Sequence, residues 1–115
     1  MSLCKSVQCS EELDVIYRGS TPEFSFDVCL DTSLVNKAET HIVFTSGTGF
    51  IDKTGDDITY GEGTMSVLLS SDDTLSFTGS QVNIQILATM TNGRKPPSEI
   101  MILPVKNSLR GDKGW

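Results

Sequence analysis

Apolar and polar residues alternate with a period of two along residues 82–90. This period is typical of a half-buried strand and not of a helix. The apolar members of the pattern are Val82, Ile84, Ile86, Ala88 and Met90, and the polar members on the opposite side are Asn83, Gln85 and Thr89. The pattern therefore predicts a strand with one apolar face and one uncharged polar face.

A second β-rich run, residues 98–105, follows the dipeptide Asn92-Gly93. Asn-Gly readily supplies the positive φ angles that a tight hairpin turn requires. The two runs are therefore predicted to form one long antiparallel hairpin. We expect this hairpin to be the centre of the fold.

Shorter β patterns precede the hairpin. Strands are expected within residues 13–18, 23–28, 41–45, 50–53, 58–60 and 64–69. Residues 31–38 and 70–77 carry hydroxyl, amide and carboxylate side chains that can cap single helical turns. In the second of these turns, Leu75 and Phe77 are expected to lie beneath the turn. Many short strands separated by turns predict an all-β fold, namely an immunoglobulin-like antiparallel β-sandwich of seven or eight short strands.

The chain has 115 residues, which suits one domain with its own core. We assign the sandwich to residues 12–106, with flexible segments at residues 1–11 and 107–115. The formal net charge is −6. A nucleic acid or an anionic membrane surface needs a basic stripe, so neither is expected as a partner. No apolar run approaches the roughly 18 residues that a membrane-spanning helix needs.

Three cysteines, Cys4, Cys9 and Cys29, are an odd number without the spacing of a metal site. One disulfide among them, or none, is compatible with the sequence, and their redox state stays open. A zinc site would need a fourth ligand, and His41 is the only histidine. The sequence therefore predicts no metal and no cofactor.

Carboxylates gather in two turns, within residues 52–57 and at residues 72–73. Calcium takes six to eight oxygen ligands, but the spacing matches no EF-hand loop, so solvated acidic turns are the simpler interpretation and calcium stays open. His41 lies in a predicted strand without a nucleophile motif nearby. We therefore expect no catalytic residue and a protein that is not an enzyme.

Several short motifs, taken in order, carry a resemblance to a known family. They are YRGSTP at residues 17–22, IVF at 42–44, the stretch ending in SSDDTLSF at 70–77, and VNIQI at 82–86 with the Asn92-Gly93 turn. This order resembles small tail-module proteins of phages and prophages of Gram-positive bacteria. It is similar to the N-terminal domain of siphophage baseplate upper proteins. The resemblance implies an immunoglobulin-like sandwich that acts in virion assembly and has no catalytic residues.

The expected function is thus that of a structural or accessory tail protein, made in the bacterial host cytoplasm and located in the virion tail. Its expected partners are itself, as a homo-oligomer, and other tail proteins. Asn83, Gln85 and Thr89 are the predicted protein-contact face, because they are uncharged and small enough to lie flat against a neighbour. The alternative is an extracellular carbohydrate- or surface-binding module, which would use exposed aromatic residues. Its candidate aromatic residues are Tyr17, Tyr60 and Trp115.

Overall fold

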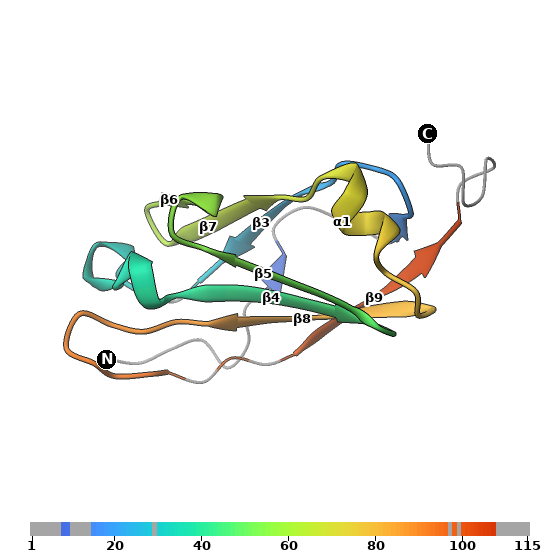
Figure 1. Ribbon diagram of the computed structural model, residues 1–115. Coiled ribbons are helices and arrows are strands. Elements are labelled where there is room, and N and C mark those ends of the chain that lie inside the picture. Colours follow the sequence, from blue (N-terminus) through green and yellow to red (C-terminus); the bar gives the residue numbers. More distant parts are fainter. Residues whose placement is uncertain (1–7, 10–14, 29, 97, 99, 108–115) are drawn as a thin grey trace.

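The computed structural model describes residues 8–9, 15–28, 30–96, 98 and 100–107, which form two stacked β-sheets (Figure 1). One sheet has the strand order β1-β3-β7-β6 and the other has the order β2-β9-β8-β4-β5. The strands are β1 (Gln8–Cys9), β2 (Ile16–Tyr17), β3 (Glu23–Asp27), β4 (His41–Ser46), β5 (Gly49–Thr54), β6 (Ile58–Gly61), β7 (Thr64–Leu68), β8 (Gln81–Leu87) and β9 (Met101–Lys106). Short helices are η1 (Thr32–Leu34), η2 (Lys37–Glu39), η3 (Gly55–Asp57) and α1 (Ser71–Leu75).

This arrangement confirms the predicted immunoglobulin-like sandwich. The order β1-β3-β7-β6 corresponds to the A-B-E-D sheet of that fold, and β9-β8-β4-β5 corresponds to G-F-C-C′. The described residues contain nine strands, more than the seven or eight expected. One pairing also differs from the antiparallel expectation, because β2 runs parallel to β9, with Ile16 opposite Val105.

The inward side chains of both sheets form one core. Four phenylalanines, Phe24, Phe26, Phe44 and Phe77, are completely buried. The ring of Phe44 links the two sheets, since its centroid lies 5.6 Å from that of Phe24 and 6.5 Å from that of Phe77. Burial of each ring contributes about 1.5–3 kcal/mol. The predicted inward positions Val82, Ile84 and Ile86 of β8 are confirmed.

The two N-terminal strands were missed or misjudged by sequence patterning. β1 falls within residues 1–11, which were predicted to be a flexible segment, and it pairs with β3. Of the residues expected to form the first strand, 13 and 14 lie outside the described residues, and β2 contains two of the other four. β1 was not predicted because a strand of two residues is too short to show an alternation.

The long hairpin predicted for residues 82–105 forms its strand pairing at the base, and at its tip the N–H of Met90 donates to the carbonyl of Arg94 over 2.8 Å. β8 and β9 pair from Gln81 opposite Pro104 to Ile84 opposite Met101. That register is the one a two-residue turn at Asn92-Gly93 would produce. Gly93 has a φ of 85°, but Asn92 keeps a negative φ, so the two-residue turn with two positive φ angles was wrong.

Residues 88–91 leave β9 and pair instead with the connection between β3 and β4. The N–H of Asn36 donates to the carbonyl of Thr89, and the N–H of Thr91 donates to the carbonyl of Leu34, each over 2.8 Å. Prolines at positions 96 and 97 explain the separation. Neither has an N–H to offer β8, and each restricts the residue before it.

Two of the sequence motifs, residues 17–22 and 70–77, lie against each other. The hydroxyl of Thr74 accepts from the N–H of Gly19 over 2.9 Å and donates to the carbonyl of Ser20 over 2.8 Å. Thr74 is fully buried, so these bonds satisfy a polar group that would otherwise be costly. The side chain of Arg18 donates to the carbonyls of Phe77 and Gly79. The motif residues thus hold the sandwich together at this end.

The short helix α1 begins with a capping box. The Ser70 hydroxyl accepts from the N–H of Asp73, and the Asp73 carboxylate accepts from the N–H of Ser70. The helical turn expected here is confirmed, and Phe77 is buried beneath it as predicted. Leu75, in contrast, is exposed, because the turn directs it away from the core.

Candidate protein-contact face

The outer face of the five-stranded sheet consists of rows of side chains set by strand register. Ile102, Asn83, Thr45 and Phe50 lie side by side across β9, β8, β4 and β5. Two further rows run across β8, β4 and β5, namely Gln85, Val43 and Asp52, followed by Leu87, His41 and Thr54. We call these ten residues the five-strand face.

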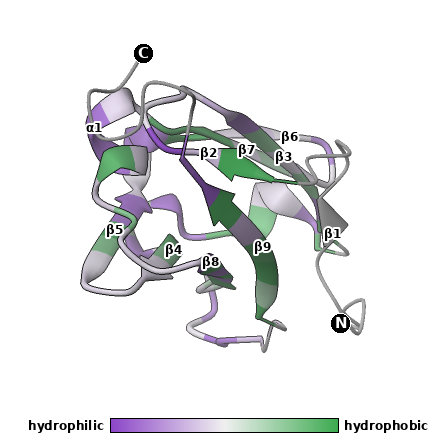
Figure 2. Cartoon of the chain, turned by 90° about the vertical axis from the view of Figure 1, so that its right-hand side faces the viewer, coloured by the Kyte–Doolittle hydropathy of each residue, from purple (hydrophilic) through white to green (hydrophobic). Residues whose placement is uncertain are grey.

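The five-strand face is rich in exposed apolar side chains. Phe50 is 64% exposed and Ile102 is 57% exposed, and Leu87 is also exposed. Figure 2 shows the apolar character of β9, whose lower part is coloured as hydrophobic. These groups share one sheet face but do not form one contiguous patch, because Asn83 and Thr45 separate Ile102 from Phe50 in the first row.

Charge is nearly absent from the five-strand face. Its only ionisable side chains are His41 and Asp52, and they contact each other, with 2.8 Å between Nδ1 and Oδ1. The whole chain carries a net charge of −6, so the rest of the surface is far more acidic. A partner that covers this face would therefore desolvate few charges.

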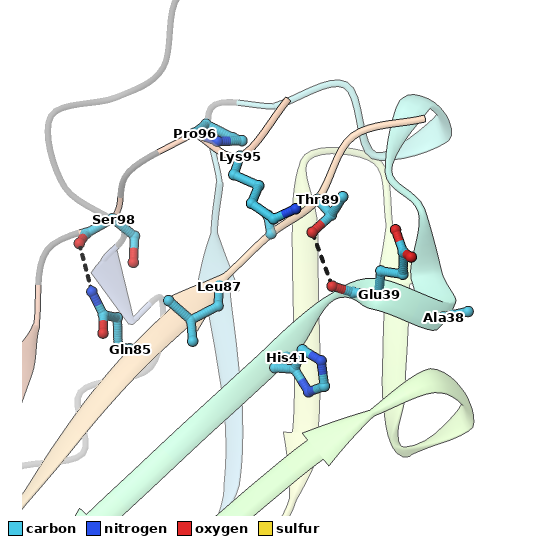
Figure 3. Close-up of a pocket in the computed structure, with 10 residues that line it drawn as sticks. Ala38, Glu39, His41, Gln85, Leu87, Thr89, Lys95, Pro96 and Ser98 are labelled. Carbon is cyan, nitrogen blue, oxygen red and sulfur yellow. Dashed lines mark hydrogen bonds between the residues drawn. The ribbon is translucent and has the colours of Figure 1, made fainter. Parts of the chain in front are cut away.

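The three residues predicted as the contact face occupy different environments. Asn83 is exposed in the first row. Gln85 is half-buried, and its Nε2 donates to the carbonyl of Ser98 over 3.2 Å. Thr89 does not lie on this surface, since it is only 5% exposed and its hydroxyl donates to the carbonyl of Glu39 over 3.0 Å (Figure 3). The position of Thr89 was mispredicted because β8 ends at Leu87 and the alternation stops there.

The apolar members of the face were missed by the sequence analysis. Phe50 precedes the inward Ile51, so alternation within β5 alone could have placed it outside. Ile102 gave no such signal, because β9 reads as a nearly continuous apolar run. A continuous run does not tell which side of a strand faces the core.

A pocket of about 600 Å³ lies where the hairpin opens, at the end of the five-strand face (Figure 3). His41, Gln85 and Leu87 line it from the face, and Lys95 and Pro96 line it from the separated segment. The hydroxyl of Ser98 donates to the carbonyl of Ile86 over 2.6 Å and holds that segment in place. The pocket therefore extends the face into a depression.

The carboxylates of the two predicted acidic turns make local contacts. The Lys53 ammonium lies 3.0 Å from the Asp73 carboxylate. The Asp57 carboxylate accepts from the N–H of Thr54 and so caps η3. Partial burial raises the pKa of Asp73, but hydrogen bonds from Ser70 and Lys53 and the Lys53 charge outweigh it, so that the pKa is lowered overall. Within the described residues no group of three or more His, Cys, Asp and Glu side chains could hold a metal ion.

Cys4 and Cys29 lie outside the described residues, and so does Trp115. Cys9 is placed in β1, with Phe26 as its strand neighbour. In the part of the chain that the structure describes, no helix is long and apolar enough to cross a membrane.

No family model, no curated protein and no solved structure matches this chain. Membership of a family is therefore not shown. The resemblance to tail-module proteins stays a prediction that rests on the sequence motifs.

Proposed function

We propose that this protein is a non-enzymatic structural or accessory protein of a phage or prophage tail, and that it acts through protein–protein contacts in virion assembly. The observation that carries the contact role is the five-strand face. This face combines exposed Phe50, Leu87 and Ile102 with a single, internally paired ionisable couple.

Physical chemistry favours this face over others on the same chain. Covering apolar surface contributes about 25 cal/mol for each Å² removed from water. Bringing an acidic surface against another protein costs free energy through desolvation and, where the partner is acidic too, through repulsion. The five-strand face offers the apolar gain with little of the electrostatic cost.

The viral context rests on the resemblance of the motifs at residues 17–22 and 70–77 to tail-module proteins. Their contacts through Gly19 and Thr74 explain why these residue types occur together, since each supplies a hydrogen bond that closes one end of the sandwich. The proposed location is accordingly the virion tail, after synthesis in the host cytoplasm, with other tail proteins as partners.

The test is the composition of purified particles. Phage particles from an induced host strain that carries this gene would be purified by density gradient and digested for mass spectrometry. We expect this chain at a fixed ratio to the tail proteins. Its absence from intact particles, with the chain present in the lysate, would refute the viral role.

The role of the face is tested in the same particles with matched variants. Asn83→Lys and Gln85→Lys place charges on the five-strand face, and we expect both to reduce incorporation. Leu68→Lys is the control, because Leu68 is exposed on the other sheet. Equal incorporation of all three variants would remove the face from the proposal.

A carbohydrate-binding role is favoured by one observation, the high exposure of Phe50 on a flat surface. Two of the aromatic residues first considered for it do not support it. Tyr17 lies in β2 and Tyr60 lies in β6, which are edge strands of different sheets, and Lys37 Nζ covers the Tyr60 ring at 5.0 Å. Binding on a glycan array that Phe50→Ala abolishes, together with absence from particles, would establish this alternative.

A further inference from the structure

We infer that the five-strand face binds a second copy of this chain, with a two-fold axis that runs parallel to the strands between β4 and β8. This inference rests on the contact role proposed above and adds the identity of the partner and the geometry. It is drawn from the register of the four strands that form the face.

The row of Ile102, Asn83, Thr45 and Phe50 is complementary to itself about this axis. It is apolar at both ends and polar in the middle. A two-fold axis between β8 and β4 exchanges the two ends of the row. Phe50 then lies over the partner's Ile102, and Asn83 lies over the partner's Thr45, so that apolar groups meet apolar groups at both ends.

The same axis exchanges Leu87 and His41 in the row of Leu87, His41 and Thr54, but here an apolar side chain meets a polar one. The axis places Leu87 over the partner's His41, whose ring remains hydrogen-bonded to its own Asp52 neighbour. Asp52 lies on β5, at the edge of the sheet and away from the axis. Two sheets packed face to face stand about 10 Å apart, which side chains of this size fill.

The distribution of charge over the surface also favours this face as the site of self-association. Two copies with a net charge of −6 each repel one another over most of their surface. The outer face of the four-stranded sheet carries Glu23 and Asp27, and no basic residue lies among its outward-facing strand residues. The five-strand face, with its internally paired His41 and Asp52, is the sheet face on which two copies can meet.

The face is smaller than a standard stable interface, so we expect a weak pairing. Ten residues for each copy are fewer than the 20–30 residues a side of a standard stable interface. A dissociation constant in the range of about 10 μM to 1 mM is therefore expected for the isolated chain. Multiple copies held together in an assembly would strengthen such a contact through a high effective concentration.

The test uses sedimentation equilibrium of the full chain from about 1 μM to above 1 mM, which covers that range. Phe50→Glu and Ile102→Lys are each expected to weaken dimerisation at least about tenfold. The double variant should restore it, because each new glutamate faces a lysine of the other copy. Within one copy the two positions are three strand spacings apart, or about 14 Å, so an internal ion pair is too distant to explain the rescue.

Two controls make the result specific. Leu68→Lys alters a side chain with the same 57% exposure as Ile102, but on the other sheet, and should leave dimerisation unchanged. Phe50→Glu combined with Leu87→Lys places opposite charges in rows that the axis does not bring together, and should not restore dimerisation. Thermal unfolding of every variant shows whether the domain remains folded.

A wild-type chain that stays monomeric at the highest concentration would overturn the inference. So would a folded double variant, Phe50→Glu with Ile102→Lys, that remains as weak as the single variants. If the chain is monomeric but present in particles, only the second-copy inference fails. If it dimerises as described but is absent from particles, only the viral function fails.

Discussion

The two outer faces of this sandwich differ although the inner faces share one core. The four-stranded sheet shows Glu23 and Asp27 to solvent, and the hydroxyls of Ser25 and Ser66 lie 3.0 Å apart between them. The five-stranded sheet shows Phe50 and Ile102 at positions of the same kind. In a strand with one buried side, every second side chain faces solvent, and folding does not require these side chains to be apolar. The outer face of the four-stranded sheet also exposes an apolar side chain, Leu68, by 57%, so the two faces differ in their charge and in the number of exposed apolar side chains and not in the presence of such side chains.

The shared interior sets the scale for all variants. Phe44→Ala removes the ring that packs against both Phe24 and Phe77. We expect the free energy of unfolding to fall by about 3–5 kcal/mol, because a large cavity remains. Urea denaturation followed by circular dichroism measures this loss. A loss below about 1 kcal/mol would mean that the two sheets do not depend on one common core.

The ion pair between Lys53 and Asp73 joins β5 of one sheet to the helix that follows β7 of the other. Asp73→Asn removes this pair and weakens the capping box, and we expect a loss of about 1–2 kcal/mol. Lys53→Met, the matched control, removes only the pair and should cost less. Equal losses would show that the cap contributes nothing.

The same carboxylate predicts an effect of pH. The pKa of Asp73 is lower in the folded chain than the ordinary value of an aspartate. Its contribution is therefore present above that ordinary value, near pH 4, and is lost as the pH falls through the lower folded pKa. Chemical denaturation of the wild type and of Asp73→Asn at neutral pH and near pH 2 measures this. The difference in stability between the two should shrink in acid.

Thr89 and Asn83 separate stability from contact. Thr89→Val removes the buried hydrogen bond to the Glu39 carbonyl, and we expect a loss of about 1 kcal/mol with no change in self-association. Asn83→Lys should have the reverse effect, with stability within about 0.5 kcal/mol and dimerisation weakened. Thermal unfolding and sedimentation of both variants test this. A Thr89→Val chain that loses dimerisation while folded would contradict the assignment of Thr89 to the interior.

The smallest effect is expected at Tyr60, on the edge strand β6. Its hydroxyl is buried without a partner among the described residues, and the nearby Thr40 hydroxyl already donates to Asn36 and accepts from the Thr89 N–H. Tyr60→Phe should therefore change the free energy of unfolding by less than about 1 kcal/mol near neutral pH.

Burial raises the pKa of Tyr60 above its ordinary value. The wild type should therefore lose stability as the pH rises above about 10, the ordinary value, towards the higher folded pKa. The Phe variant should lose less over the same range. Denaturation at pH 9 and pH 11 compares the two chains.

The sequence predicted the parts of the fold that depend on local pattern. The alternation of Val82, Ile84 and Ile86 predicted the buried side of β8. The two-residue turn predicted at Asn92-Gly93 is not formed. Thr89 was misplaced because its environment depends on a pairing with residues 34–36, more than fifty positions earlier. A contact of that range leaves no periodic trace near Thr89.

The candidate face was the least predictable part. Only Asn83 and Gln85 of its ten residues were expected there, and they were chosen for lacking charge. The row that connects Ile102 to Phe50 requires the spatial order β9-β8-β4-β5, which places strands far apart in the chain side by side. Sequence pattern gives the two sides of a strand, but it does not give the neighbours of that strand in a sheet.

The parallel pairing of β2 with β9 has a consequence for synthesis. The strand of Ile16 has no neighbour until Val105 has been synthesised. The Arg18 side chain likewise lacks one of its acceptors until Asn107 has been synthesised, and it donates to the Asn107 side chain over 2.6 Å. Joining segments so distant in sequence is slow, and exposed strand edges invite wrong pairing meanwhile. While the ribosome is still making the chain, the five-stranded sheet therefore lacks β9 and the strand that β9 holds. Its completion is a step that follows translation of nearly the whole sandwich.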